Sequence, residues 1–195
     1  RRGSFGAIGK AERRGASEEV SPKTDDKDSL AVLRNVISGV DRLVKQDVAE
    51  FLEQLTELPH ASRIQTRVAG KSHEDRDLLL VRAALPDIDE ETAVRLLVIA
   101  NIHAGEVEGK EAVQELLREI TNGEHTDLLR DAVLYFVPIY NVDGNERISS
   151  KNRRQQNGPE AVGQRPNAQG FDLNRDFVKA EAPETQTLLR LMREL

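Results

Sequence analysis

The chain has 195 residues, a length that suits one or two domains, and its formal net charge at neutral pH is −6. An acidic balance argues against a nucleic-acid-binding protein, which would normally carry a basic face or stripe. No apolar run approaches the roughly 18 residues that a membrane-spanning helix needs, so no such segment is expected. Because the sequence has no cysteine, disulfides, thiolate metal sites and cysteine nucleophiles are excluded together.

The amino-terminal part of the chain divides at Ser29. Residues 1–28 are rich in glycine, serine and charged side chains and lack apolar periodicity, so we expect a disordered leader. From Ser29 to Leu55, apolar residues recur at spacings of three and four, which predicts one or two amphipathic helices. We therefore expect the folded part to comprise residues 29–195.

The middle of the chain changes between strand-like and helix-like patterns. Residues 64–68 and 78–81 predict two strands joined by a turn, and residues 94–102 are apolar enough to predict a central, buried strand. Residues 107–120 have the apolar spacing of a helix, and residues 132–139 predict another buried strand. A strand, a helix and a second strand in this order form a βαβ unit, so we expect an α/β fold.

The last third begins with a long polar segment. Residues 141–170 are rich in Asn, Gly, Gln and Arg, and loops of this length in compact domains are usually functional or disordered. A final amphipathic helix is expected from about Pro183 to the end, with Leu188, Leu189 and Met192 as its apolar stripe.

The first candidate site lies where the strand 94–102 gives way to the helix. His103 and Glu106 are three residues apart, which places both side chains on one side of a first helical turn. An imidazole and a carboxylate so placed are a natural beginning for a zinc site. The alternative is a surface histidine and glutamate at a helix start, because H-x-x-E is short and often matches by accident.

The second candidate site is at the end of the long loop, where Asp172 stands two residues before Asn174 and Arg175. These side chains could orient a metal-bound histidine, donate an amide hydrogen bond and clamp an anion. Taken alone, the segment is better interpreted as a capping loop with a solvated arginine. The sequence Asn141-Val142-Asp143-Gly144, after the strand 132–139, is best interpreted as a turn.

These motifs, in this order and spacing, resemble the zinc carboxypeptidase family typified by carboxypeptidase A. The sequence GKSHEDR at residues 70–76 is also similar to the family's G-x-S-x-E-G-R turn, although Asp75 replaces the usual glycine. The resemblance covers about residues 60–180. It implies a mixed central sheet flanked by helices, of which this chain would be the amino-terminal part and therefore incomplete.

The resemblance also implies roles for individual residues. His103 and Glu106 would be two of the three protein ligands of one Zn²⁺ ion, and Asp172 would hold the other nitrogen of His103. Asn174 and Arg175 would bind the free carboxylate at the end of a peptide or peptide-like substrate. Arg76 would lie near the cleft, where it would polarise a carbonyl or contact the substrate. For the family's carbonyl-polarising arginine we favour Arg154 over the other candidates that the loop offers, which are Arg147, Arg153 and Arg165.

The family's third ligand, a histidine, and its general base, a glutamate, have no matching positions before Leu195. His73 is the nearest substitute for the histidine, but the family turn supplies no ligand there. We therefore expect the isolated chain to be an incomplete, inactive and poorly stable domain.

The activity implied is zinc-dependent hydrolysis of carboxy-terminal peptide bonds. Two other functions stay open: a zinc amidase or deacylase of the same broad fold, and a binding module that recognises C-terminal carboxylates without catalysis. A structural α/β domain with accidental motifs is the simplest alternative.

Overall fold

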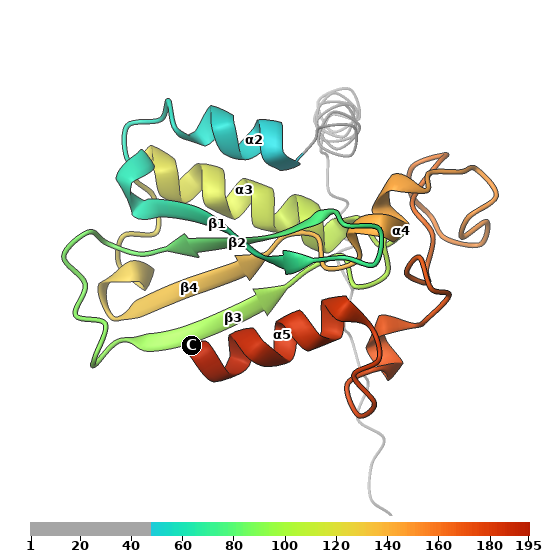
Figure 1. The fold of residues 1–195 in the computed structure, drawn as a ribbon. Helices are drawn as coiled ribbons and strands as arrows, with labels where there is room; N and C mark the ends of the chain where they lie inside the picture. The colour runs from blue at the N-terminus through green and yellow to red at the C-terminus, as the bar shows by residue number, and fades with distance from the viewer. Residues whose placement is uncertain (1–47) are drawn as a thin grey trace, which may run out of the picture. The chain divides into compact units, whose positions relative to one another are not determined.

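The computed structural model describes residues 48–195, so the expected leader and the helical stretch before Val48 lie outside the described residues. A four-stranded sheet lies between helices on both faces (Figure 1). Helices α2 (Val48–Leu55) and α3 (Glu108–Asn122) cover one face, and α5 (Pro183–Glu194) covers the other. The predicted α/β architecture is confirmed.

The strand order is β1-β2-β4-β3, for β1 (Ile64–Lys71), β2 (Asp77–Ala83), β3 (Val94–Ile99) and β4 (Ala132–Val137). The pairs β1/β2 and β2/β4 are antiparallel, whereas β3 and β4 are parallel and joined through α3. The mixed sheet and the βαβ unit agree with the prediction. The structure differs at two boundaries: β1 continues to Lys71, and β3 already ends at Ile99.

The central strand is β4, and all six of its residues are buried. Its side chains alternate between the two cores, so that Leu134 and Phe136 pack with α2 and α3, whereas Val133 and Tyr135 pack with α5. A strand covered on both faces has a continuous apolar sequence, which is why the pattern identified it.

Strand β3 is not central within the described sheet, and the prediction of a buried strand is wrong for these residues. It pairs only with β4, and Val94, Leu96 and Val98 are 56%, 46% and 39% exposed. These three side chains point to the face that carries α3, because Leu96 pairs with Leu134 of that core. An apolar run specifies a strand but not which neighbours cover it.

Helix α5 packs on its face of the sheet through Leu188 and Leu191, both buried. The predicted stripe is wrong at Met192, which is 62% exposed. The register of the helix is fixed by its approach to β1: a Cβ placed on Gly70 would collide with the side chain of Thr187. The packed face therefore includes Thr187 and excludes Met192.

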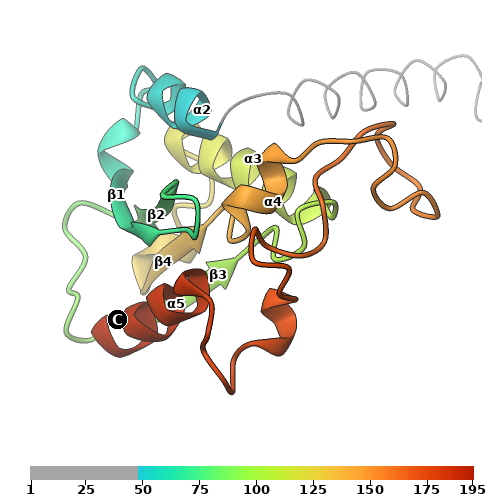
Figure 2. The same cartoon turned by 45° about the vertical axis from the view of Figure 1, so that its right-hand side comes forward.

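Strand directions gather three connecting segments at one end of the sheet. The carboxyl ends of β3 and β4 lie there because the two strands are parallel. The turn at residues 72–76 lies there too, because β2 runs antiparallel to β4. The short helix α4 (Val142–Glu146) and the long loop after it are at the same end (Figure 2).

Candidate metal centre

His103 lies between two carboxylates at the carboxyl end of β3. Its Nδ1 is 3.2 Å from both carboxylate oxygens of Glu106, and its Nε2 is 2.9 Å from Oδ1 of Asp172. The imidazole is almost completely buried, with a side-chain exposure of 5%. The structure thus brings together three residues that the sequence had singled out from two separate motifs.

A tight turn between β3 and α3 presents His103 and Glu106 on one side. Asn101 begins the turn at φ 55°, a left-handed conformation that asparagine tolerates better than most residues. Its Nδ2 donates to the carbonyl oxygens of Ala104 and Glu106, each at 3.2 Å. The backbone N–H of Glu106 donates to the carbonyl of His103 at 2.8 Å. These bonds fix the backbone from which both side chains project.

The donor set fits a zinc ion. Two ligand atoms bound to one tetrahedral zinc at about 2.1 Å lie about 3.4 Å apart, which is close to the 3.2 Å between Nδ1 of His103 and the oxygens of Glu106. Asp172 fits the role of partner, since a metal-bound imidazole usually gives its other N–H to a carboxylate. Within residues 48–195, no further histidine or carboxylate completes a group of three with His103 and Glu106.

Both carboxylates are held in the ionised form that a metal site needs. Burial by itself would raise the pKa of Glu106, but hydrogen bonds and charge from His103 and Arg153 keep this pKa below its ordinary value. Burial also opposes ionisation of Asp172, yet hydrogen bonds from His103, Arg165 and a backbone amide lower the pKa of Asp172 to about 2. Neither group would have to lose a proton at neutral pH before a metal bound.

Two arginines of the long loop reach these carboxylates. Nη2 of Arg153 is 2.5 Å from Oε1 of Glu106. Arg165 donates to Oδ2 of Asp172 through Nε at 3.2 Å and Nη2 at 2.8 Å, and its Nη1 is 4.0 Å from Glu106. Arg154, the arginine favoured from the sequence, is exposed and forms no hydrogen bond or ion pair with the rest of the described chain.

Arg76 is tied to a buried aspartate that the sequence had presented only as a turn residue. Asp143 is fully buried and accepts hydrogen bonds from Oγ of Ser72 at 2.7 Å, Nη1 of Arg76 at 2.7 Å and the N–H of Glu74 at 3.0 Å. The three donors are 67 to 71 residues away in the sequence, so no local pattern could reveal the contact. The partly exposed side chain of Glu74 also forms an ion pair with Arg147.

Asn174 and Arg175 lie on a short 3₁₀ turn (Leu173–Arg175) directly after Asp172, and both are exposed. The backbone N–H of Asn174 donates to Oδ1 of Asp172 at 3.0 Å. Within the described part of the chain, Nη1 of Arg175 donates only to the neighbouring carbonyl of Asn174, at 3.0 Å. The carboxylate that supports His103 therefore also anchors the segment that carries Asn174 and Arg175.

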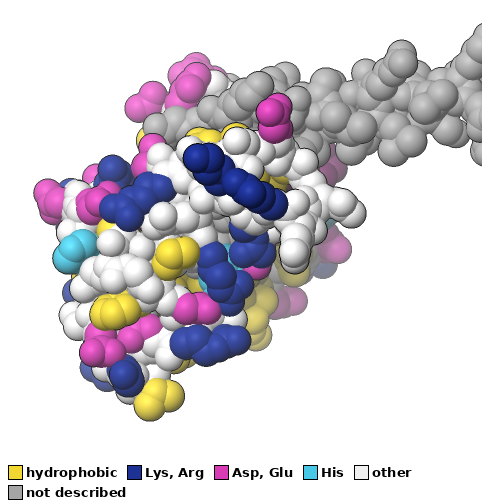
Figure 3. All heavy atoms as spheres, turned by 90° about the vertical axis from the view of Figure 1, so that its right-hand side faces the viewer, with side chains coloured by type: hydrophobic (Ala, Val, Ile, Leu, Met, Phe, Trp, Pro, Cys, Tyr) yellow, Lys and Arg dark blue, Asp and Glu magenta, His cyan; other side chains and the backbone are white. Residues whose placement is uncertain are grey.

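The face at this end of the molecule is rich in basic side chains, with a histidine visible among them (Figure 3). The region from α4 to the 3₁₀ turn contributes Arg147, Lys151, Arg153, Arg154, Arg165 and Arg175. This concentration stands out in a chain whose overall charge is negative.

A family model described as zinc carboxypeptidase matches residues 48–191. The chain belongs to the zinc carboxypeptidase family. Its family is therefore one of zinc-dependent metallopeptidases, which are hydrolases that act in proteolysis. The resemblance inferred from the motifs is confirmed.

Related sequences agree with this assignment. The chain is 31% identical over 147 residues to carboxypeptidase D of Mus musculus and 31% identical over 146 residues to carboxypeptidase D of Rattus norvegicus. These matches cover 72% and 71% of this chain but only 10% of each relative. The chain thus spans about a tenth of the length of these relatives.

Solved structures show the same fold. A metallo-carboxypeptidase from Pseudomonas aeruginosa is 27% identical, with a TM-score of 0.54 over 75% of this chain and 35% of its own. A metallo-carboxypeptidase from Burkholderia cenocepacia is 22% identical, with a TM-score of 0.58 over 75% of this chain and 37% of its own. The described residues therefore correspond to part of the zinc carboxypeptidase fold.

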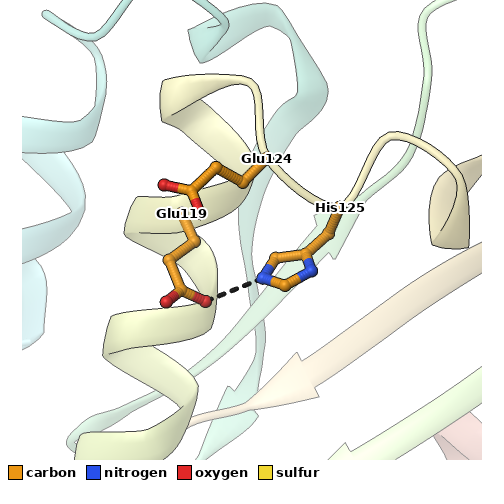
Figure 4. Close-up of side chains that lie close together, drawn as sticks. All are labelled: Glu119, Glu124 and His125. Atoms are coloured by element: carbon orange, nitrogen blue, oxygen red, sulfur yellow. Dashed lines mark hydrogen bonds and ion pairs between the residues drawn. The ribbon is translucent and has the colours of Figure 1, made fainter.

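A second group of metal-ligand types lies far from this centre, at the end of α3. Figure 4 shows Glu119 and His125 pointing toward each other, with an Nε2 to Oε2 distance of 2.8 Å, and Glu124 on the adjoining turn. The side chains of Glu119 and His125 are 36% and 41% exposed. Because α3 runs back from the metal centre, His125 lies at the opposite end of the sheet and cannot serve as the third ligand of His103 and Glu106.

None of the helices between Val48 and Leu195 has the length and apolar character needed to span a bilayer.

Proposed function

We propose that His103 and Glu106 hold the zinc ion of a metallocarboxypeptidase that hydrolyses the last peptide bond of a chain with a free C terminus. The observation that carries this proposal is the placement of His103, with Nδ1 facing Glu106 and Nε2 on Asp172, beside the Asn174–Arg175 segment. When bound, zinc lowers the pKa of a water molecule and polarises the scissile carbonyl.

The surrounding side chains divide the remaining tasks. Arg175 and Asn174 are exposed next to the centre and would bind the terminal carboxylate, because a guanidinium fork and an amide suit that group. A site built to pair a free carboxylate rejects a chain that continues past it. In support, the related Pseudomonas aeruginosa enzyme is solved in complex with (2-guanidinoethylmercapto)succinic acid, a compound that carries carboxylates.

For the carbonyl-polarising arginine we propose Arg165 in place of Arg154. The Arg165 side chain is 43% exposed and its guanidinium lies between Asp172 and Glu106, so one side of the group can face a substrate. Arg153 is less suited, because its side chain is only 20% exposed and is already bonded to Glu106 and Gln156. Arg76, held by Asp143, would contact the substrate further along the cleft.

Residues 48–195 bring no further histidine or carboxylate to complete a group of three ligands with His103 and Glu106. We therefore propose that this chain alone does not hydrolyse peptides and that further groups complete the site. The test uses the protein in its natural, full-length form, with peptides whose C terminus is free or amidated.

The expected result is zinc-dependent release of the last residue from the free peptide and none from the amidated one. His103→Ala should abolish turnover, and Arg175→Ala should raise KM for the free peptide. Release from the amidated peptide at an equal rate would instead support the amidase or deacylase alternative. Binding of the free peptide without turnover, with zinc present, would support the binding-module alternative.

A further inference from the structure

The loop that follows α4 is fastened to the turn that carries Glu106 by two side-chain contacts, and a third contact within the loop joins them. Nη2 of Arg153 lies 2.5 Å from Oε1 of Glu106, and Nε of Arg153 lies 2.5 Å from Oε1 of Gln156. Gln156 in turn donates through Nε2 to the carbonyl of Gly105 at 2.8 Å. Arg153, Gln156, Gly105 and Glu106 thus form a closed ring of contacts across two segments that are about fifty residues apart.

The backbone on both sides of this ring is adapted to it. A Cβ on Gly105 would collide with Cδ of Arg153 and would lie 2.9 Å from the carbonyl oxygen of Gly163. Gly105 does not have a positive φ, so the glycine serves the close approach and not an unusual turn. Arg153 itself has φ 49°, a conformation that a residue with a side chain adopts only when its surroundings enforce it.

The neighbouring arginine shows that the arrangement is specific to one position. Arg154 carries the same charge in the same loop, yet it is exposed and makes no hydrogen bond or ion pair within residues 48–195. The side chain of Arg153 is only 20% exposed, compared with 41% for the Glu106 carboxylate that it contacts. Burial of a long charged side chain against a glycine, with its guanidinium hydrogen-bonded to two partners, indicates a built support.

We propose that Arg153, braced by Gln156 and seated on Gly105, is a positioning residue that orients the metal ligand Glu106. The proposal rests on the proposed function, in which Glu106 is a zinc ligand. Arg153 holds Oε1 of Glu106 and limits rotation of the Glu106 carboxylate. Both carboxylate oxygens of Glu106 lie 3.2 Å from Nδ1 of His103. Partners of this kind typically change metal affinity by about 10- to 100-fold when they are removed.

The charge of Arg153 acts in the opposite sense, because a guanidinium close to the site repels a divalent cation. A test by removing Arg153 would mix the loss of support with the loss of this repulsion. Gln156→Ala avoids the problem, since it removes the brace without changing any charge. Gly105→Ala also leaves the formal charge unchanged, but its Cβ would move Arg153 itself and would press on the carbonyl of Gly163, so Gln156→Ala is the primary test and Gly105→Ala supports it. Arg154→Ala is the matched control, as it removes one charge from the loop and no contact.

The experiment measures zinc affinity by competition with a chelator, in the protein in its natural, full-length form, together with the urea midpoint of the metal-free protein. Gln156→Ala and Gly105→Ala should each weaken zinc binding by about tenfold or more, whereas Arg154→Ala should change it by less than about twofold. Gln156→Met, which keeps the length of the side chain without the acceptor for Nε of Arg153 or any charge, should weaken zinc binding as much as Gln156→Ala.

The urea midpoints separate a local effect from a general one. Gln156→Ala should leave the midpoint of the metal-free protein near the wild-type value, because Gln156 lies in a surface loop. Equal or tighter zinc binding by Gln156→Ala would overturn the proposal. So would a loss of zinc affinity that only follows a lowered midpoint, or unchanged zinc affinity in Gln156→Met.

Failure of the proposed function would look different. In that case wild-type protein would bind zinc, and the variants would differ in zinc affinity as expected, but the free peptide would not be hydrolysed. Zinc-dependent hydrolysis by a Gln156→Ala variant with unchanged zinc affinity would refute the positioning role and leave the proposed function standing.

Discussion

Replacement of Asp143 by asparagine should destabilise the protein through the loss of one buried, charge-assisted hydrogen bond. The carboxylate is fully buried and accepts bonds from Ser72, Arg76 and the N–H of Glu74. An asparagine of the same shape turns one of the two acceptors into an NH₂ group, which costs about 1.5–3 kcal/mol for a bond to a charged group. The side chain of Arg76 is 41% exposed, so weakening its ion pair adds only about 1 kcal/mol or less.

The total of about 2–4 kcal/mol can be measured by urea unfolding at pH 7 and compared with Arg147→Ala. That control breaks an exposed ion pair with Glu74, and its effect on stability should be much smaller because solvent screens the pair. The loss in free energy of unfolding caused by Asp143→Asn should also depend on pH. Burial opposes ionisation of Asp143, but Ser72 and Arg76 hold its pKa below the ordinary value of 3.8.

A lowered pKa means that the unfolded chain binds the proton more tightly, so the stabilising contribution is present above about pH 4. This contribution is lost as the pH falls through the lowered pKa that Asp143 has in the folded protein. The difference in free energy of unfolding between wild type and Asp143→Asn should therefore become smaller below about pH 4. A gap under about 0.5 kcal/mol at pH 7, or one that stays constant down to about pH 3, would refute this account of the buried carboxylate.

Three further predictions concern other parts of the molecule. Asp172→Asn should weaken zinc binding by about 10- to 100-fold, measured by chelator competition, because it removes the carboxylate partner of His103; unchanged affinity would contradict that role. Burial raises the pKa of Glu184, so its folded form binds the proton more tightly and stability is lost as the pH rises through the raised value. The free energy of unfolding of Glu184→Gln should therefore rise relative to that of wild type as the pH increases from about 4.5 to 8. A difference between the two proteins that does not change with pH would contradict this prediction. The exposed apolar row on β3 should make this chain self-associate, so Leu96→Lys should lower the associated fraction in sedimentation experiments, whereas Leu128→Lys, at a residue of similar exposure elsewhere, should not; an unchanged fraction in Leu96→Lys would contradict this.

The elements that the sequence predicted well are those whose environment is uniform along their length. Strand β4 is covered on both faces and has a continuous apolar sequence, and α3 keeps one buried stripe that includes Val113 and Leu117. Strand β3 has a similar apolar composition but lies at the edge of the described sheet. Its exposed residues depend on which segments lie beside it, and that information is not local to residues 94–102.

At the candidate metal centre, too, the sequence predicted some residues and not others. His103, Glu106 and Asp172 belong to motifs with fixed spacing, so the resemblance to the family was enough to predict that these three side chains lie together, as they do in the structure. The arginines could not be ranked, because their loop has no regular period and tolerates insertions. What distinguishes Arg153 from Arg154 is a backbone at φ 49° and the space above Gly105, neither of which a residue-type pattern records.

The proposed zinc ligands follow the same strand, β3, that carries the exposed apolar side chains. His103 follows the carboxyl end of β3, and the same strand leaves one edge unpaired and Val94, Leu96 and Val98 exposed within the described sheet. A further strand paired parallel to β3 would cover that edge and would also bring its own carboxyl end beside His103, since parallel strands end on the same side. A single added neighbour at β3 would thus bury the apolar row and place a new side chain within reach of His103. Under the proposed function, the edge of β3 is therefore where the stability of the fold and the zinc ligands would depend on the same contacts.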